Sequence, residues 1–232
     1  MSAGPPVVLL HGLGRTRLAM LPLARALRRE GFEAVNLGYF GPGGVALGLR
    51  QLRERLARRL GERAAGPLDF VTHSMGGIVA RALLGSGEVA GRRLVQLAPP
   101  NQGAAIANRV RRLPLLARVP ALWDLGRRAE GGLGFDVPPL RGVEVGVIAG
   151  RSFGPWHGGR PSDGVVRVEE TYLPEARDWI LLEHFHTVVM NARDTRENVV
   201  AFLRGGRFLP AAPRLERSAA GEVRLAGAGA LC

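Results

Sequence analysis

At 232 residues and 24.8 kDa, with 46% hydrophobic and 22% charged residues, the chain suits one soluble globular domain with a sizeable core. Its single cysteine, Cys232, excludes a disulfide framework and a cysteine-built metal site, and no apolar run approaches the ~18 residues that span a bilayer. The net charge of +12 comes wholly from arginines scattered among Leu and Ala. Because few aromatic residues accompany these arginines, their pattern indicates a solvated surface rather than a nucleic-acid binding site.

The chain begins without a basic segment followed by a long apolar stretch. We therefore expect no signal peptide and a cytoplasmic protein, while an exported mature form that has lost its signal stays open. Short aliphatic runs then alternate with amphipathic stretches whose apolar residues recur every three or four positions. The expected strands are residues 7–10, 32–37, 68–72, 94–97, 143–149 and 179–182. The expected helices are residues 18–29, 47–60, 76–84, 105–112, 115–128 and 195–203.

This alternation of strand and helix predicts an α/β fold with a parallel sheet covered by helices on both faces. Pro22 fits only the first turn of its helix, so that helix is expected to begin later than residue 18. After Phe208 the composition shifts to Ala, Gly, Pro and Arg. We therefore divide the chain into a main domain, residues 1–208, and an appended tail, residues 209–232.

A serine stands between the third expected strand and the following helix, in the run V-T-H-S-M-G-G at residues 71–77. This is the position of a nucleophile elbow, where a sharp turn lifts a serine hydroxyl above the sheet. Small residues are needed because strand and helix come close there, and Gly76 supplies one. Thr72 stands where G-x-S-x-G has its first glycine. A serine that merely caps an ordinary helix is the alternative interpretation of Ser74.

The glycine-rich run H-G-L-G at residues 11–14 follows the first strand. Such a bend can aim a backbone N–H at the place where an ester oxygen becomes negative. The backbone N–H of Leu13, together with that of Met75, would then complete an oxyanion hole. A plain turn at the end of a strand is the alternative.

A serine nucleophile needs a base, and the chain has five histidines. His186, after the last expected strand, is preferred over His184, which stays open because H-x-H leaves the register ambiguous. His11 and His73 belong to the two turns just described and are interpreted as structural. His11, His157 and Phe185 are also candidates for the wall of a substrate pocket.

The base in turn needs an acid that fixes its tautomer and stabilises the imidazolium. Asp163 lies in a turn after the fifth expected strand, between the serine and the histidine in the chain. The resulting order Ser, Asp, His is the one that this architecture uses. Asp178, Glu169 and Glu183 are the alternatives for the acid.

Taken together these motifs resemble the α/β-hydrolase superfamily, and within it the small bacterial esterases and triacylglycerol lipases. The resemblance spans roughly residues 6–208 and rests on six short runs in the expected order. They are V-L-L-H-G-L at 8–13, V-T-H-S-M-G-G at 71–77, A-P-P-N-Q-G at 98–103, V-I-A-G at 147–150, S-D-G-V-V at 162–166 and H-T at 186–187.

The resemblance implies a Ser74–His186–Asp163 triad with the Leu13 and Met75 amides as oxyanion donors. It implies a minimal α/β-hydrolase fold of about six parallel strands, flanked by helices on both faces, with at most a small lid from the 104–140 stretch. The implied chemistry is two-step acyl transfer on a small-molecule or lipid ester, with no metal or organic cofactor. No nucleic-acid partner is expected, and the basic surface allows weak contact with an anionic membrane.

That activity competes with two other interpretations. The same triad serves thioesters, amides and phospholipids equally well. A non-catalytic member of the fold would use the pocket only to bind a ligand.

Overall fold

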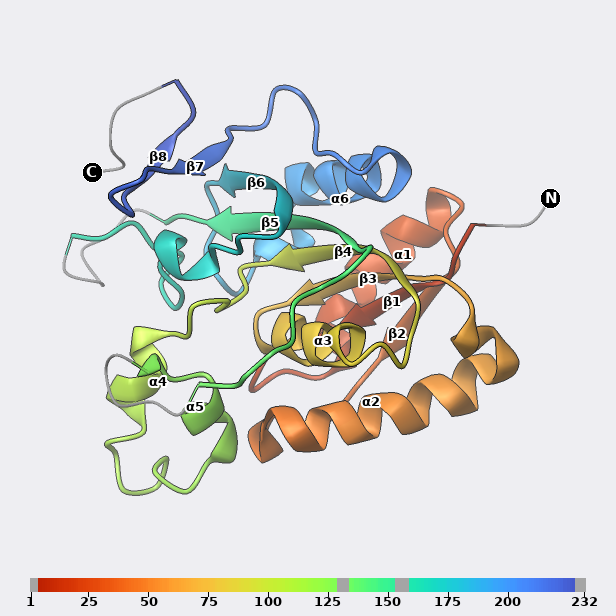
Figure 1. The fold of residues 1–232 in the computed structure, drawn as a ribbon, viewed down its shortest axis with the longest axis horizontal. Coiled ribbons are helices and arrows are strands. Elements are labelled where there is room, and N and C mark those ends of the chain that lie inside the picture. Colours follow the sequence, from red (N-terminus) through yellow and green to blue (C-terminus); the bar gives the residue numbers. More distant parts are fainter. Residues whose placement is uncertain (1–3, 129–133, 153–158, 228–232) are drawn as a thin grey trace.

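A computed structural model describes residues 4–128, 134–152 and 159–227 of the chain. Six parallel strands form one sheet in the order β2-β1-β3-β4-β5-β6 (Figure 1). The strands are β1 (Val7–Leu10), β2 (Ala34–Leu37), β3 (Leu68–His73), β4 (Gly91–Leu97), β5 (Glu144–Gly150) and β6 (Ala176–Leu182). The expected parallel sheet of about six strands is confirmed.

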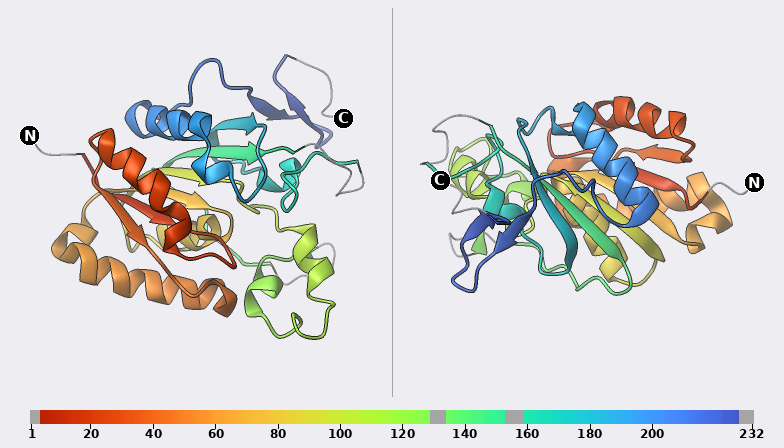
Figure 2. Two further views of the ribbon diagram at one scale, coloured as in Figure 1. Left: turned by 180° about the vertical axis from the view of Figure 1, so that it is seen from behind. Right: turned by 90° about the horizontal axis from the view of Figure 1, so that it is seen from above.

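The helices are α1 (Leu21–Arg29), α2 (Gly44–Leu60), α3 (Met75–Gly85), α4 (Ala105–Val110), α5 (Pro120–Asp124) and α6 (Arg193–Gly205). Of these, α2 and α3 cover one face of the sheet and α1 and α6 cover the other, as the views from behind and above show (Figure 2). Alternate residues of each strand feed the two cores: Val8 and Leu10 pack on the α2–α3 side, whereas Val7 and Leu9 pack on the α1–α6 side. This two-sided burial explains why the strands read as continuous apolar runs.

Two expected helices differ from the structure at proline residues. The first begins at Leu21 and holds Pro22 in its opening turn, as the proline requires. The expected helix over residues 115–128 is wrong in extent, because only Pro120–Asp124 is α-helical. Pro120 takes the first helical position, and Val119 before it is extended at φ −87° and ψ 107°.

The segment with α4 and α5 lies beyond the carboxyl edge of the sheet, the edge toward which the strands run in Figure 1. This is where parallel sheets place their ligands. After Phe208 the chain forms a hairpin of β7 (Leu215–Arg217) and β8 (Val223–Leu225), and Arg214 bridges to Ile180 of β6. The division of the chain after residue 208 stays a prediction.

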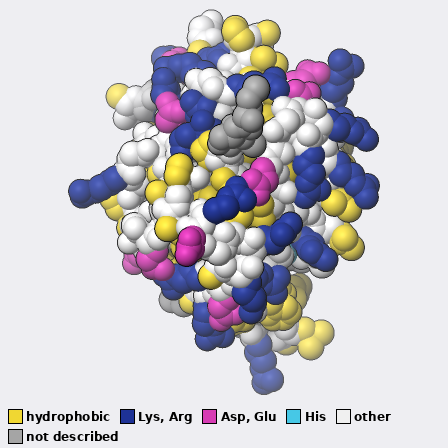
Figure 3. Space-filling view, turned by 90° about the vertical axis from the view of Figure 1, so that its right-hand side faces the viewer, with side chains coloured by type: hydrophobic (Ala, Val, Ile, Leu, Met, Phe, Trp, Pro, Cys, Tyr) yellow, Lys and Arg dark blue, Asp and Glu magenta, His cyan; other side chains and the backbone are white. Residues whose placement is uncertain are grey.

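Arginines are dispersed over the surface with carboxylates between them. Figure 3 shows this on the face at the amino ends of the strands. Several are paired, among them Arg63 with Glu33 and Arg204 with Glu30. Within the described ranges, none of the helices has the length and apolar character that a membrane span requires.

Candidate active site

Ser74 lies in a strained turn between β3 and α3. Its backbone has φ 52° and ψ −127°, a region that residues with a side chain rarely adopt. The Ser74 N–H donates to Leu97 O at 2.9 Å, and its carbonyl accepts from Gly77 N–H at 2.9 Å. The turn is therefore held at both ends, and the Ser74 side chain, 7% exposed, stands at the carboxyl edge of the sheet.

Close backbone approach explains the glycines around this turn. A Cβ on Gly76 would lie 2.6 Å from His11 O, and one on Gly12 would lie 2.9 Å from Ser74 Cβ. Neither distance is tolerable, so the bend after β1 and the turn around Ser74 fit together only with glycine at both positions. Thr72, by contrast, has room: it is fully buried and its hydroxyl donates to Val95 O at 3.3 Å.

Asp163 and His186 form a buried pair at the same edge. Asp163 Oδ2 lies 2.7 Å from His186 Nδ1, and the backbone N–H of His186 donates to Asp163 O at 2.9 Å. Asp163 Oδ1 accepts from the N–H groups of Val165 and Val166 at 2.9 and 2.7 Å. Because Oδ1 of Asp163 is occupied by these two amides, the bond to His186 runs through Oδ2, and we assign its hydrogen to Nδ1 of His186.

His73 joins this pair to the serine. Its Nε2 lies 2.9 Å from His186 O, and because a carbonyl only accepts, Nε2–H is the donor. The two imidazole rings lie 4.7 Å apart between centroids. Burial, with a smaller contribution from His186, lowers the pKa of His73 well below its ordinary value, so the ring is neutral. His73 directly precedes Ser74 in the chain, so this bond links the backbone of His186 to the residue next to the serine. That Ser74, His186 and Asp163 act as one triad stays a prediction.

The two proposed oxyanion donors flank this group. Met75 is the first residue of α3, where backbone N–H groups lack a partner within the helix. Leu13 follows Gly12, which abuts Ser74, and its Cα is 3.5 Å from the place where a Cβ on Gly41 would stand. The bend that carries the Leu13 amide is thus packed between Ser74 and the 3-10 turn Gly41–Gly43 that precedes α2.

The remaining sequence candidates lie in other settings. His11 is buried: Nδ1–H donates to Gly12 O at 2.9 Å, Nε2 accepts from Tyr39 N–H at 3.3 Å, and the ring stacks on Tyr39 at 4.6 Å. Its pKa is lowered, chiefly by burial. Nε2 of His184 pairs with Asp194 Oδ1 at 2.7 Å. Phe185 is 55% exposed, and His157 lies outside the described residues.

The alternative acids are each paired with an arginine. Glu169 accepts from Arg160, Glu183 accepts from Arg151, and Asp178 accepts from the N–H of Phe208 and from Arg214. Sequence reasoning treated His73 as structural and missed its bond to the backbone of His186. No spacing in the sequence signals a contact across 113 residues.

The chain matches the sequence model of the alpha/beta hydrolase family over residues 7–229. In shape it is similar to Bacillus licheniformis lipase BlEst2 in its mature form, with a TM-score of 0.68, 17% identity, and coverage of 90% of this chain and 94% of that one. It is also similar to phospholipase PlaB from Legionella pneumophila, with a TM-score of 0.63, 17% identity, and coverage of 88% and 60% respectively. A metagenomic carboxyl esterase, MGS0156, gives a TM-score of 0.57 at 18% identity, with coverage of 90% and 72%. No curated protein matches the chain.

Proposed function

The chain belongs to the alpha/beta hydrolase family, and on that premise we propose that it is a serine carboxylic-ester hydrolase acting on short to medium acyl or lipid esters. The observation that carries the proposal is the 2.7 Å pair of His186 and Asp163 beside a serine with strained backbone. A lipase, a phospholipase and a carboxyl esterase share the fold, and all three names denote ester cleavage, which supports an ester as the substrate.

The reaction runs in two acyl-transfer steps. Nε2 of His186 takes the proton of Ser74, whose Oγ bonds to the ester carbonyl carbon while the carbonyl electron pair moves to oxygen. The amides of Leu13 and Met75 donate to that oxyanion. When the intermediate collapses, the alcohol leaves with the proton from His186. Water, deprotonated by the same histidine, then releases the acid and restores Ser74.

Asp163 serves as the group that holds the base in its working tautomer. Its Oδ1 accepts from the amides of Val165 and Val166, which fixes the carboxyl group, and its Oδ2 lies against Nδ1 of His186, where it stabilises the imidazolium that forms when His186 accepts a proton. His184 is a weaker candidate for the base, because its Nε2 is already paired with Asp194.

An exposed apolar tip supports a lipid ester as substrate. Leu113 and Leu115 between α4 and α5 are 56% and 91% exposed, and Leu116 is exposed beside them. Arg112 and Arg118, both exposed, flank the three leucines. Exposed apolar side chains between two cations suit a weak contact with an anionic lipid surface. This segment lies at the carboxyl edge of the sheet, where the candidate site also lies.

The second candidate, a ligand-binding protein without catalysis, is less well supported. A binding site has no use for a buried carboxylate that fixes one imidazole tautomer next to a strained serine. Thioesters, amides and phospholipids remain alternatives as substrates for the same three side chains.

Hydrolysis of p-nitrophenyl esters of graded acyl length tests the proposal. We expect turnover by the wild-type chain and a loss of about a thousandfold or more in Ser74→Ala. Ser86→Ala, at the far end of α3, is the matched control and retains activity, since its hydroxyl bonds Leu83 O and the Glu88 side chain, away from Ser74. Absence of turnover across the whole panel, or equal turnover in Ser74→Ala, would overturn the proposal.

A further inference from the structure

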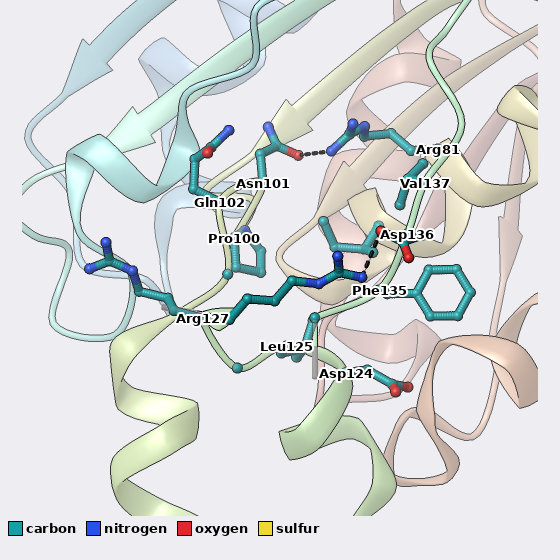
Figure 4. A pocket seen from close by; sticks show the side chains of 15 residues that line it. Arg81, Pro100, Asn101, Gln102, Asp124, Leu125, Arg127, Phe135, Asp136 and Val137 are labelled. Atoms are coloured by element: carbon teal, nitrogen blue, oxygen red, sulfur yellow. Dashed lines mark hydrogen bonds and ion pairs between the residues drawn. The ribbon is translucent and has the colours of Figure 1, made fainter. Parts of the chain in front are cut away.

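A hollow of about 470 Å³ lies beside α3, and neither Ser74 nor His186 lines it. Its walls come from α3, from the loop after β4, from the end of α5 and from residues 134–137 (Figure 4). Arg81, two turns along α3 from Ser74, stands on one wall with its guanidinium directed at Asn101. The volume falls within the range of small-molecule sites.

Arg81 is a buried charge that has no carboxylate partner among the residues that the structure describes. Arg81 is only 7% exposed. Within the described part of the chain, no carboxylate lies within 4 Å of its guanidinium. Its one hydrogen bond runs from a terminal nitrogen to Asn101 Oδ1 at 3.0 Å, and its Nε is buried without a partner. Burial lowers the pKa of Arg81, with only a partial offset from the distant Glu175.

Asn101 is fixed and cannot turn to satisfy Arg81 further. Its Nδ2 donates to Gln96 Oε1 at 3.0 Å and to Thr171 O at 2.9 Å. Gln96 Nε2 in turn donates to Asn101 Oδ1 at 3.3 Å. The amide network therefore holds one terminal nitrogen of the guanidinium, and the remaining N–H groups of the terminal nitrogens are the donors open to a ligand.

The two carboxylates on the walls are engaged elsewhere. Asp124 Oδ2 accepts from Val45 N–H at 2.7 Å, and Asp136 pairs with Arg128 at 2.6 Å on the exposed rim. An anion in the hollow would thus meet Arg81 without displacing an existing ion pair. A buried guanidinium favours oxyanions because its planar fork matches two oxygens at once.

We propose that this hollow binds the phosphate group of a ligand through Arg81, at a site separate from the proposed ester-cleaving group. The phosphate supplies the negative charge that Arg81 lacks among the described residues. The rest of the hollow accommodates the atoms attached to that phosphate. The source is either a free phosphate compound or the head group of a phospholipid, and the two are distinguished by the probes below.

The test uses the full chain and two probes, inorganic phosphate and a short-chain phosphatidylglycerol kept monomeric in solution. Calorimetric titration and the thermal unfolding midpoint are measured against sodium chloride of equal ionic strength. We expect phosphate binding by the wild type and a dissociation constant at least about tenfold weaker in Arg81→Met, because several charge-assisted bonds are lost. Binding of the phospholipid alone assigns the site to a head group, and binding of both assigns it to phosphate in general.

Three variants keep the result interpretable. Arg193→Gln, an exposed arginine outside the hollow, retains binding, and Arg81→Lys keeps the charge but loses the fork, so it binds with intermediate strength. Ser74→Ala retains binding whether or not the chain cleaves esters, which separates this proposal from the proposed function. Binding of neither probe by the wild type, or binding of equal strength in folded Arg81→Met or Arg81→Lys, would overturn it.

Discussion

His73 Nε2 donates a hydrogen bond to the carbonyl oxygen of His186 at 2.9 Å, so the residue before the proposed nucleophile holds the backbone of the proposed base. The bond joins the end of β3 to the loop after β6, although two strands, β4 and β5, lie between them in the sheet. Because His73 is buried and neutral, this link does not depend on a charge. It explains how two loops from distant strands keep a common geometry.

We predict that His73→Leu lowers kcat roughly a hundredfold with little change in KM, because a base displaced by about 1 Å loses its alignment. The variant also loses about 1–3 kcal/mol of unfolding free energy, since the His186 carbonyl is left unpaired. Steady-state kinetics and urea unfolding measure both. His73→Gln, which keeps an N–H at similar reach, should retain much of the wild-type kcat. A kcat for His73→Gln as low as that of His73→Leu would show that the bond does not position the base.

Replacing the acid should disable the base while the fold persists. Asp163→Asn is expected to reduce kcat by about 10⁴, because the amide favours the wrong tautomer of His186. His184→Ala is the control and loses only a pair with Asp194 on the surface, worth about 0–1 kcal/mol. Kinetics on a single p-nitrophenyl ester decide the matter. A larger loss in His184→Ala than in His186→Ala would transfer the base to His184.

Stability should fall on acidification because two histidines are held neutral. The pKa values of His73 and His11 lie below the ordinary 6.5, so the unfolded chain takes up protons that the folded chain refuses. Above pH 6.5 both histidines are neutral in the folded and the unfolded chain, so their protonation takes nothing from the unfolding free energy. Below pH 6.5, each lowers the unfolding free energy by up to about 1.4 kcal/mol per pH unit. Glu170 has a raised pKa and acts in the opposite sense near its own titration.

Urea unfolding between about pH 8 and about pH 5.5 measures this effect. We expect the unfolding free energy of the wild type to decline below about pH 6.5, and His73→Gln to decline less steeply because one neutral histidine is gone. A slope unchanged by the substitution would mean that His73 is not the group that resists protonation.

Close packing around the serine turn predicts an asymmetry between two glycines. Gly76→Ala would place a Cβ 2.6 Å from His11 O and is expected to cost about 1–3 kcal/mol or more, with loss of activity as the Leu13 bend shifts. Gly205→Ala, at the end of α6, meets nothing within 4 Å and should be neutral or slightly stabilising. Thermal unfolding and ester hydrolysis of the two variants test the contrast, and equal behaviour would contradict it.

Much of the fold could be predicted because its local and global preferences agree. The strand β1 is a short apolar run and the helix α1 after it shows one apolar face, so periodicity alone places both. The helix α3 is buried on all sides and is placed instead by the strand before it and the glycines at its start. The segment between α4 and α5 could not be placed, because Pro114 and Pro120 divide a stretch whose composition resembles a helix. Proline geometry overrides propensity there.

The candidate site residues could be predicted only where the neighbouring residues in sequence form a recognisable local pattern. Ser74 does so through the glycines that close packing requires, and Asp163 through its turn. The bond from His73 to His186 and the pair of His184 with Asp194 depend on tertiary distance, so the sequence alone leaves both histidines open as the base. The unneutralised Arg81 is likewise invisible in a chain rich in arginine.

Covalent labelling shows whether Ser74 is a nucleophile that His186 activates, because the reagent reacts only with an activated serine. An organophosphonate ester is incubated with the wild type, Ser74→Ala, His186→Ala and Ser86→Ala, and the modified peptide is located by mass spectrometry. We expect one adduct, on Ser74, in the wild type and in Ser86→Ala. It should be absent from Ser74→Ala and form far more slowly in His186→Ala. An adduct on another residue, or labelling of Ser74 at an undiminished rate without His186, would contradict the proposed roles of Ser74 and His186.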